Sequence, residues 1–173
     1  LMCYNKRSPD NHHYISTISS LLKHPKIDPN IQNNQGFTPL HMLIAYRKNC
    51  PKNYNYSSVM KMLLMHPTIN PNSRTIKLKN SPLHTIIQQI IAFKPKTSSR
   101  HINGSSFTYC DYSQIKNLLT IIVLLLNHSK IDLTIKNNNQ ETLLHLVAHS
   151  QKTKEIAKFL LEKQVDKYSK NKN

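Results

Sequence analysis

Short apolar segments at helical spacing alternate along the chain with polar stretches rich in Asn and Pro. Leu40, Leu43 and Ile44 share one helix face, because positions three and four residues apart lie side by side on a helix. The spacing returns at Leu83, Ile86, Ile87 and Ile90, and at Leu144, Val147 and Ala148. We expect helices at 12–24, 39–48, 57–66, 82–93, 113–128, 143–150 and 153–163. Each has one apolar face, so neighbouring helices must stack to form a core.

A three-part unit recurs in the same order. Its centre reads Thr38-Pro39-Leu40-His41, Ser81-Pro82-Leu83-His84 and Thr142-Leu143-Leu144-His145. Upstream lie the entries Ile27-Asp28-Pro29-Asn30, Ile69-Asn70-Pro71-Asn72 and Ile131-Asp132-Leu133-Thr134, each preceded by a Leu-Leu-x-His helix end. Thr38 can cap the following helix with its hydroxyl, and Pro39 suits the first helical position because no N–H is needed there.

This register resembles the ankyrin repeat family, whose unit carries T-P-L-H-x-A, a second helix ending in L-L and a D-x-N entry. The best match runs over 28–41. The resemblance implies an all-α ankyrin-repeat solenoid of stacked helix pairs with short hairpin fingers, in a single domain over 1–173. Full repeats are expected at 27–66, 69–128 and 131–163, and partial repeats at 1–26 and 164–173, where another hairpin would begin.

The repeats are longer than the roughly 33 residues of the family. The excess falls between the two helices of a unit, at 49–57 and 94–111, in polar segments that contain Pro51, Pro95 and Gly104. Such segments are typical of loops. The family's Gly after the second helix is also missing, and His24, His66 and His128 stand in that turn.

The net charge is only a weak indication of what the chain binds. The chain has 24 Lys and Arg against 8 acidic residues, a net charge of +16, which attracts nucleic acid, anionic lipid or an acidic protein surface. The basic residues are spread along the chain, and an AT-rich genome also enriches Lys and Asn. No apolar run approaches the roughly 20 residues of a membrane-spanning helix. Cys3, Cys50 and Cys110 form no C-x-x-C pair, which favours free thiols in a reducing, cytoplasmic compartment.

The sequence contains no recognisable catalytic motif. G-x-S-x-G, a Gly-rich phosphate loop and H-E-x-x-H are all absent. The resemblance implies that His41, His84 and His145 hydrogen-bond to backbone across the hairpins. Equivalent histidines of successive repeats would lie about 8–10 Å apart, too far to share one zinc ion. We therefore expect no enzyme activity, no metal and no cofactor.

Binding residues are expected on the concave side, where the resemblance places partners. The tips span 32–37, 74–79 and 136–141. The candidates on these tips are Asn34, Phe37, Arg74, Lys77, Lys79, Lys136 and Asn138, and those in or beside the insertions are Tyr54, Tyr56 and Tyr109. Phe37 is either an interface anchor or packs against the next hairpin, and the basic tip is either a binding patch or an ordinary solvated face.

We expect a monomeric protein-interaction module whose partner is acidic or of host origin. Divergent repeats and AT-rich coding are compatible, by analogy, with a poxvirus-like host-range protein or with a secreted effector of an intracellular bacterium that acts in the host cytoplasm, and we favour the effector. Two alternatives stay open: an electrostatic binder of nucleic acid or anionic membrane, and a targeting domain of a larger enzyme whose catalytic part is absent here.

Overall fold

Helices dominate the part of the chain that the structure describes. The computed structural model describes residues 11–45, 56–94, 96–102, 105–111, 113–148 and 150–169. Its helices are α1 (Asn11–Leu22), α2 (Pro39–Ala45), α3 (Tyr56–Leu64), α4 (Pro82–Ile91), α5 (Ser113–Leu126), α6 (Leu143–Ala148) and α7 (Lys154–Ser169), with a 3₁₀ turn at Gln151–Thr153. Two strands, β1 (Lys96–Ile102) and β2 (Ser105–Asp111), lie between α4 and α5.

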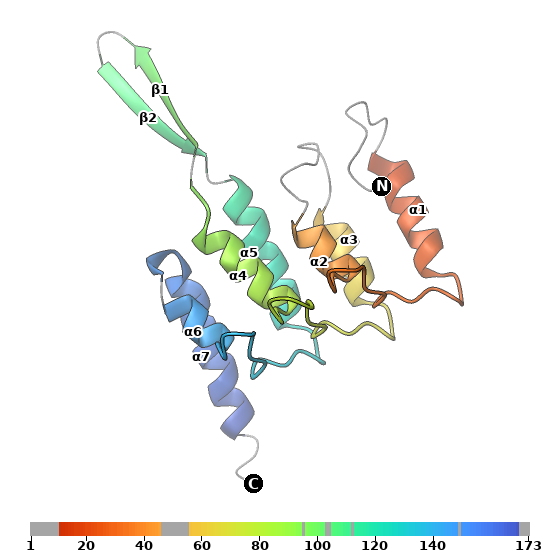
Figure 1. Ribbon diagram of the computed structural model, residues 1–173. Coiled ribbons are helices and arrows are strands. Elements are labelled where there is room, and N and C mark those ends of the chain that lie inside the picture. The colour runs from red at the N-terminus through yellow and green to blue at the C-terminus, as the bar shows by residue number, and fades with distance from the viewer. Residues whose placement is uncertain are drawn as a thin grey trace.

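The helices stack in antiparallel pairs, as Figure 1 shows. α2 pairs with α3, α4 with α5 and α6 with α7. The first helices form one row, in which α4 packs between α2 and α6, and the second helices α1, α3 and α5 form another. The expected all-α solenoid of helix pairs is therefore confirmed, with one exception at the strands.

One continuous apolar core runs through the stack. It contains the apolar positions that the sequence placed on helix faces, including Leu40, Ile44, Leu83 and Ile87, each no more than 1% exposed. Burial of such a side chain stabilises the fold by about 1.5–3 kcal/mol. Neighbouring repeats bury one another's faces, so no single pair has a core of its own.

Local hydrogen bonds begin and end the helices. Ser81 is the N-cap of α4, and its Oγ accepts from the backbone N–H of His84 at 3.4 Å. After the second helix of a pair, α3 or α5, the turn lacks the family's Gly and is closed by a histidine ring instead. His66 Nδ1 accepts from Thr68 N at 3.4 Å, and His128 Nδ1 accepts from Lys130 N at 3.2 Å.

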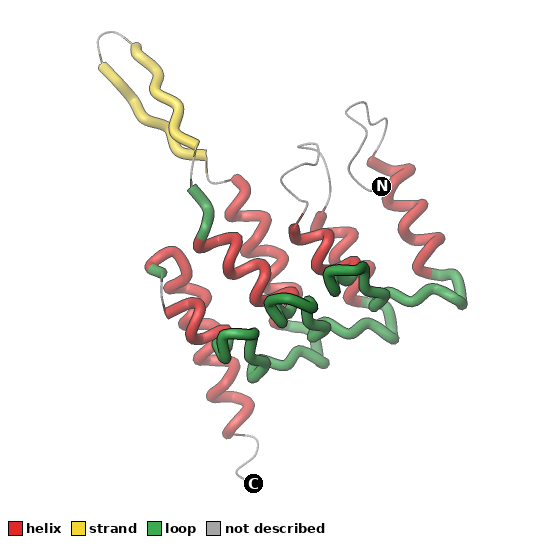
Figure 2. The backbone as a smooth tube through the Cα atoms, viewed as in Figure 1, coloured by secondary structure: helices red, strands yellow, loops and turns green. Residues whose placement is uncertain are grey.

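Three loops project from the same end of the stack, in green in Figure 2. We name them finger 1 (residues 32–37), finger 2 (residues 74–80) and finger 3 (residues 136–141). Each is closed by a backbone hydrogen bond, and the three closing bonds are Asn33 N to Phe37 O, Thr75 N to Asn80 O and Asn137 N to Glu141 O, at 3.1, 3.0 and 2.9 Å.

The second insertion is not a loop, contrary to the sequence-based expectation for 94–111. β1 and β2 pair antiparallel without a bulge, from Lys96 opposite Asp111 to Ile102 opposite Ser105. The strands project beyond α4 and α5, at the opposite end of the stack from the fingers (Figures 1 and 2). The first insertion falls largely outside the described residues.

The expected hairpin at 164–173 is also wrong as far as Ser169. α7 continues through Val165 and Asp166, which the sequence suggested as a new entry, and residues 170–173 lie outside the described chain. No Pro or Gly interrupts this segment, whereas α1 and α3 end at Leu22 and Leu64, shortly before Pro25 and Pro67. No helix in the described ranges is long and apolar enough to cross a membrane.

Candidate binding surface

The fingers are joined to one another edge to edge. Ile76 N donates to Gln35 O at 3.0 Å, and Asn138 N donates to Leu78 O at 2.9 Å. A second set of bonds runs through side chains: Gln32 Nε2 donates to Arg74 O at 3.0 Å, and the Arg74 guanidinium donates to Lys136 O at 3.4 Å. The fingers therefore present one connected surface instead of three separate loops.

Buried histidines tie each finger to the repeat before it. His41 Nε2 donates to Asn80 O at 3.1 Å, and His84 Nε2 donates to Glu141 O at 3.2 Å. Each Nδ1 accepts from the hydroxyl of the cap residue three positions earlier, at 2.9 and 2.7 Å. Burial lowers the pKa of both histidines, and the hydrogen bonds to backbone carbonyls only partly oppose that shift. Both rings are therefore neutral linkers at pH 7.

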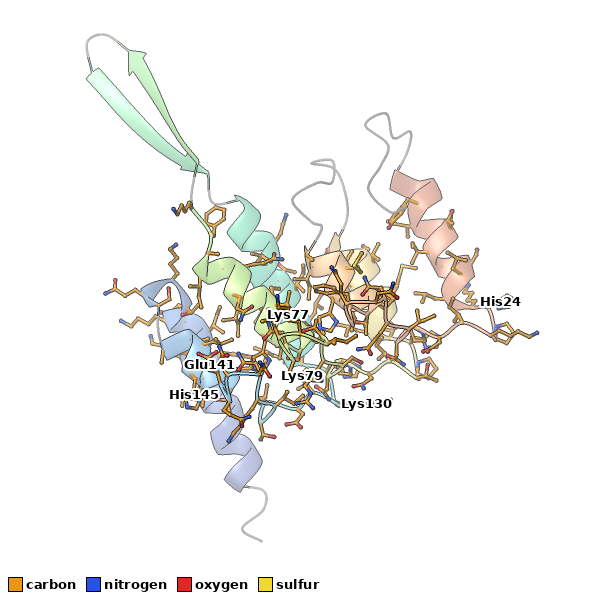
Figure 3. The ribbon with its side chains drawn as sticks, viewed as in Figure 1. His24, Lys77, Lys79, Lys130, Glu141 and His145 are labelled. Carbon is orange, nitrogen blue, oxygen red and sulfur yellow. The ribbon has the colours of Figure 1, made fainter. Side chains whose placement is uncertain are left out.

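His145 occupies the equivalent position in the last described repeat, but it is exposed. Its Nδ1 accepts from Thr142 Oγ1 at 2.8 Å and from Thr142 N at 3.3 Å, so the ring is oriented as in the inner repeats. Figure 3 places it beside Glu141 at the end of the finger row.

Each finger has a left-handed residue at the same point, two positions before the helix cap. These residues are Gly36, Lys79 and Gln140, with φ of 79°, 53° and 61°. Only finger 1 has the glycine that this conformation favours. A Cβ on Gly36 would also lie 2.5 Å from the backbone N of Ile76, so finger 2 approaches finger 1 too closely for a side chain.

Finger 2 differs from its neighbours in length and chemistry. Its closing bond spans one more residue than those of fingers 1 and 3. The tip carries Ile76 and Leu78, which are 57% and 52% exposed. The inter-finger hydrogen bonds join Ile76 to Gln35 of finger 1 and Leu78 to Asn138 of finger 3. Counted from the residue whose N–H closes each finger, Ile76 corresponds to Asn34 and Asn138. Two large aliphatic side chains therefore stand in water where the other fingers carry amides.

The sequence reasoning missed Ile76 and Leu78 as candidate binding residues. The signal was present, because Leu78 lies between Lys77 and Lys79 and Ile76 directly precedes Lys77, in a tip that contributes nothing to a helix face. An exposed apolar patch that is rimmed by polar residues marks an interaction surface.

Basic side chains surround this apolar pair. Arg74, Lys77, Lys79 and Lys136 are all exposed, and Figure 3 shows Lys77 and Lys79 on the finger side of the stack. Glu141 lies nearby, but its Oε2 accepts from the side-chain amides of Asn137 and Asn139, at 2.8 and 3.5 Å. The surface thus combines two exposed aliphatic residues with an excess of positive charge.

The other expected binding residues divide between two ends of the molecule. Phe37 is half-buried, with its ring edge-on to His41 at a centroid distance of 5.7 Å, so it packs within its own repeat. Tyr109 lies in β2, at the end opposite the fingers (Figure 1). Tyr56 begins α3, and Tyr54 lies outside the described residues. Tyr56 and Tyr109 are therefore not part of the finger surface.

Among the described side chains, no three His, Cys, Asp or Glu residues gather as a metal site would require. His24, His66 and His128 each accept a hydrogen bond from the backbone two residues later. In the described chain these bonds close the turns, and His128 Nε2 also donates to Leu64 O of the preceding repeat at 3.1 Å.

The comparison with protein families agrees with the repeat register over one unit. The family model described as "Ankyrin repeat" matches residues 35–76, from finger 1 to finger 2. None of the curated proteins matches the chain. Among solved structures, the chain is similar to the crystal structure of the ankyrin repeat protein EF0377, at 16% identity and a TM-score of 0.39, over 88% of this chain and 77% of that one.

The matched segment holds one unit of the stack: the tip of finger 1, the helix pair α2–α3 and the entry to finger 2. The same cap, histidine and finger geometry returns in the units around α4 and α6. The family match over residues 35–76 and the recurring geometry therefore support the ankyrin repeat family for this chain.

Proposed function

We propose that this chain binds an acidic protein through its fingers, with Ile76 and Leu78 as the apolar anchors. Ankyrin repeats are protein-interaction modules, and the chain shares that general role. The observation that carries the finer proposal is the exposure of these two side chains, 57% and 52%, in the centre of a polar row. Apolar anchors ringed by polar groups are typical of interaction hot spots.

The preference for an acidic partner follows from the surrounding charges. Arg74, Lys77, Lys79 and Lys136 are exposed around the anchors. The ion pair between Lys158 and Glu155 lies within α7, away from the fingers. A partner with carboxylates at the rim would be steered to this surface and oriented on it.

The connected geometry of the fingers supports the same proposal. Backbone bonds hold finger 2 on both sides, at Gln35 and at Asn138. A surface that is ordered before binding loses less entropy when a partner docks.

Site-specific photo-crosslinking tests the proposal. A benzoylphenylalanine probe replaces Leu78 in one protein and Met65, which is 82% exposed at the end of α3, in the control. Both are exposed to eukaryotic cell lysate and the captured proteins are identified by mass spectrometry. We expect a discrete protein from the Leu78 position that persists at roughly 0.5 M salt, where exposed charge pairs are largely screened.

Substitution of an anchor separates specific capture from background. Ile76→Asn places at this position the residue that fingers 1 and 3 already carry, so the backbone is compatible. We expect the capture yield to fall at least about tenfold. Equal capture from both probe positions, or full capture by the Ile76→Asn variant, would contradict the proposal.

The competing interpretations stay predictions with their own test. Binding of nucleic acid or anionic membrane through the +16 charge predicts an affinity that falls steeply with salt and is indifferent to Ile76→Asn. Roles as a secreted effector in a host cell, or as the targeting domain of a larger enzyme, depend on the identity of the captured partner and of the complete gene.

A further inference from the structure

The β1–β2 insertion is a second exposed structure, remote from the fingers. Its two strands form a sheet of their own, and neither strand packs substantially against a helix of the described chain. The insertion extends away from the helix stack in Figure 1, so the described helices cover neither of its long sides.

A two-stranded sheet has, along each outer edge, backbone groups that are not paired with another strand. Each strand of an antiparallel pair directs alternate N–H and C=O groups toward its partner and the others outward. The register covers every residue of β1, so its outer edge is an unbroken row of donors and acceptors. Such an edge is a template for another strand, and an isolated pair of strands is marginally stable without one.

We propose that the outer edge of β1 takes up an extended acidic segment of a partner protein as a third strand. β1 contains Lys96, Arg100 and His101 and no carboxylate, whereas β2 ends in Asp111. The β1 edge is thus the more attractive one for an acidic strand. The inference goes beyond the finger surface and stands whether or not the fingers bind.

The charge of the chain argues against a second copy at this edge. Two copies of β1 would bring their basic residues together in one sheet, and each whole chain carries +16. Like charges on neighbouring strands are destabilising, whereas opposite charges stabilise strand pairs. An acidic strand would pair with the backbone groups of the β1 edge and would also attract the basic residues of β1.

Amide NMR with a defined peptide tests the proposal. The probe is a capped peptide of about eight residues that alternates Glu and Val, close to the length of common strands. The control peptide has the same sequence with N-methyl groups on two adjacent central residues. Because neighbouring amides of a strand point to opposite sides, this change blocks both edges of the peptide and leaves its charge unchanged.

We expect the unmodified peptide to slow hydrogen exchange at alternate amides of β1 and the methylated peptide to bind at least about tenfold more weakly, since backbone bonds give strand addition its affinity. Arg100→Glu in the protein weakens binding severalfold without touching a helix, and Ile76→Asn leaves it unchanged. Equal binding of the two peptides, or protection confined to the fingers, would overturn the proposal.

Discussion

Lys79 and Gln140 adopt a conformation that the equivalent Gly36 adopts at little cost. All three donate the backbone hydrogen bond that tightens the finger: Gly36 N to Asn33 O at 2.8 Å, and Lys79 and Gln140 to Thr75 and Asn137 at 3.1 Å each. A left-handed conformation costs a residue with a Cβ about 1–2 kcal/mol. The fingers therefore hold strain at two positions, which the closing bonds and the neighbouring fingers offset.

Relief of that strain is measurable at Gln140, which lies outside the proposed anchors. We expect Gln140→Gly to raise the free energy of unfolding by about 0.5–1 kcal/mol, because the strain outweighs the added flexibility of glycine in the unfolded chain. Urea unfolding followed by circular dichroism measures the change. Gly36→Ala is the opposite substitution and should destabilise by more, since its Cβ would meet Ile76 N at 2.5 Å. A loss of stability in Gln140→Gly would show that the φ of 61° is not strained.

At the scale of elements, the histidines join one finger to the next. His41 and His84 each connect a helix start to the closing residue of the following finger, Asn80 or Glu141. Protonation of Nδ1 would remove the acceptor of the cap hydroxyl and place a charge in a buried site. The coupling between repeats is therefore sensitive to acid.

The pH dependence of stability follows from the lowered pKa of these two histidines. In the unfolded chain a histidine titrates near pKa ~6.5, so below that pH the unfolded state binds more protons than the folded state. The stabilisation is complete above about pH 6.5 and is lost as the pH falls toward the lower folded pKa. We expect urea midpoints to drop between about pH 7.5 and pH 5.

Substitution of one buried histidine tests this assignment. The difference between the two pH values should shrink in His84→Gln and stay the same in His145→Gln, whose histidine is exposed. An unchanged pH dependence in His84→Gln would assign the acid sensitivity to other groups.

The elements also show which features the sequence could reveal. Helix starts were predictable because Thr38, Ser81 and the prolines after them have local chemistry that few other structures use. The β1–β2 insertion was missed, although Asn103-Gly104 stands between the paired residues Ile102 and Ser105. That dipeptide is a strong signal for a two-residue hairpin. The many Ser residues of this segment and the preceding Pro95 favoured the prediction of a loop.

The two anchors of the finger surface could not be identified from the sequence, for a different reason. Ile76 and Leu78 are identified as unusual only when their positions are compared with Asn34 and Asn138, and the extra residue in finger 2 obscures that comparison. Phe37 illustrates the converse, because its exposure depends on the position of the His41 ring. Cap chemistry is local, whereas the exposure of a side chain depends on how the folded chain packs around it.

At the scale of the whole molecule, each repeat is stabilised by its neighbours. α4 packs against α2, α5 and α6, whereas α7 packs against α6 and the 3₁₀ turn before it. Repeat proteins behave approximately as a sum of repeat and interface stabilities, so the ends open at lower cost than the centre.

Native-state hydrogen exchange should reveal this gradient. We expect the slowest amide exchange in α4, whose Leu83, Ile86 and Ile90 are almost fully buried, and faster exchange in α1 and α7 at the ends of the described stack. Ile87→Ala should lower the protection of α4 and of both neighbouring pairs, at a cost of about 2–5 kcal/mol. Uniform protection from α1 to α7 would mean that the stack unfolds as one unit.

The placement of the β1–β2 insertion has a consequence for how this scaffold changes over time. Lys96 and Asp111 are register partners, so the segment leaves and rejoins the stack at neighbouring points while α4 and α5 keep their contact. Such an attachment point accepts a replacement segment of another length or sequence without a change in the repeats. Evolution, or a protein engineer who grafts a loop, can therefore replace the inserted segment at one end of the stack and leave the fingers at the other end unchanged.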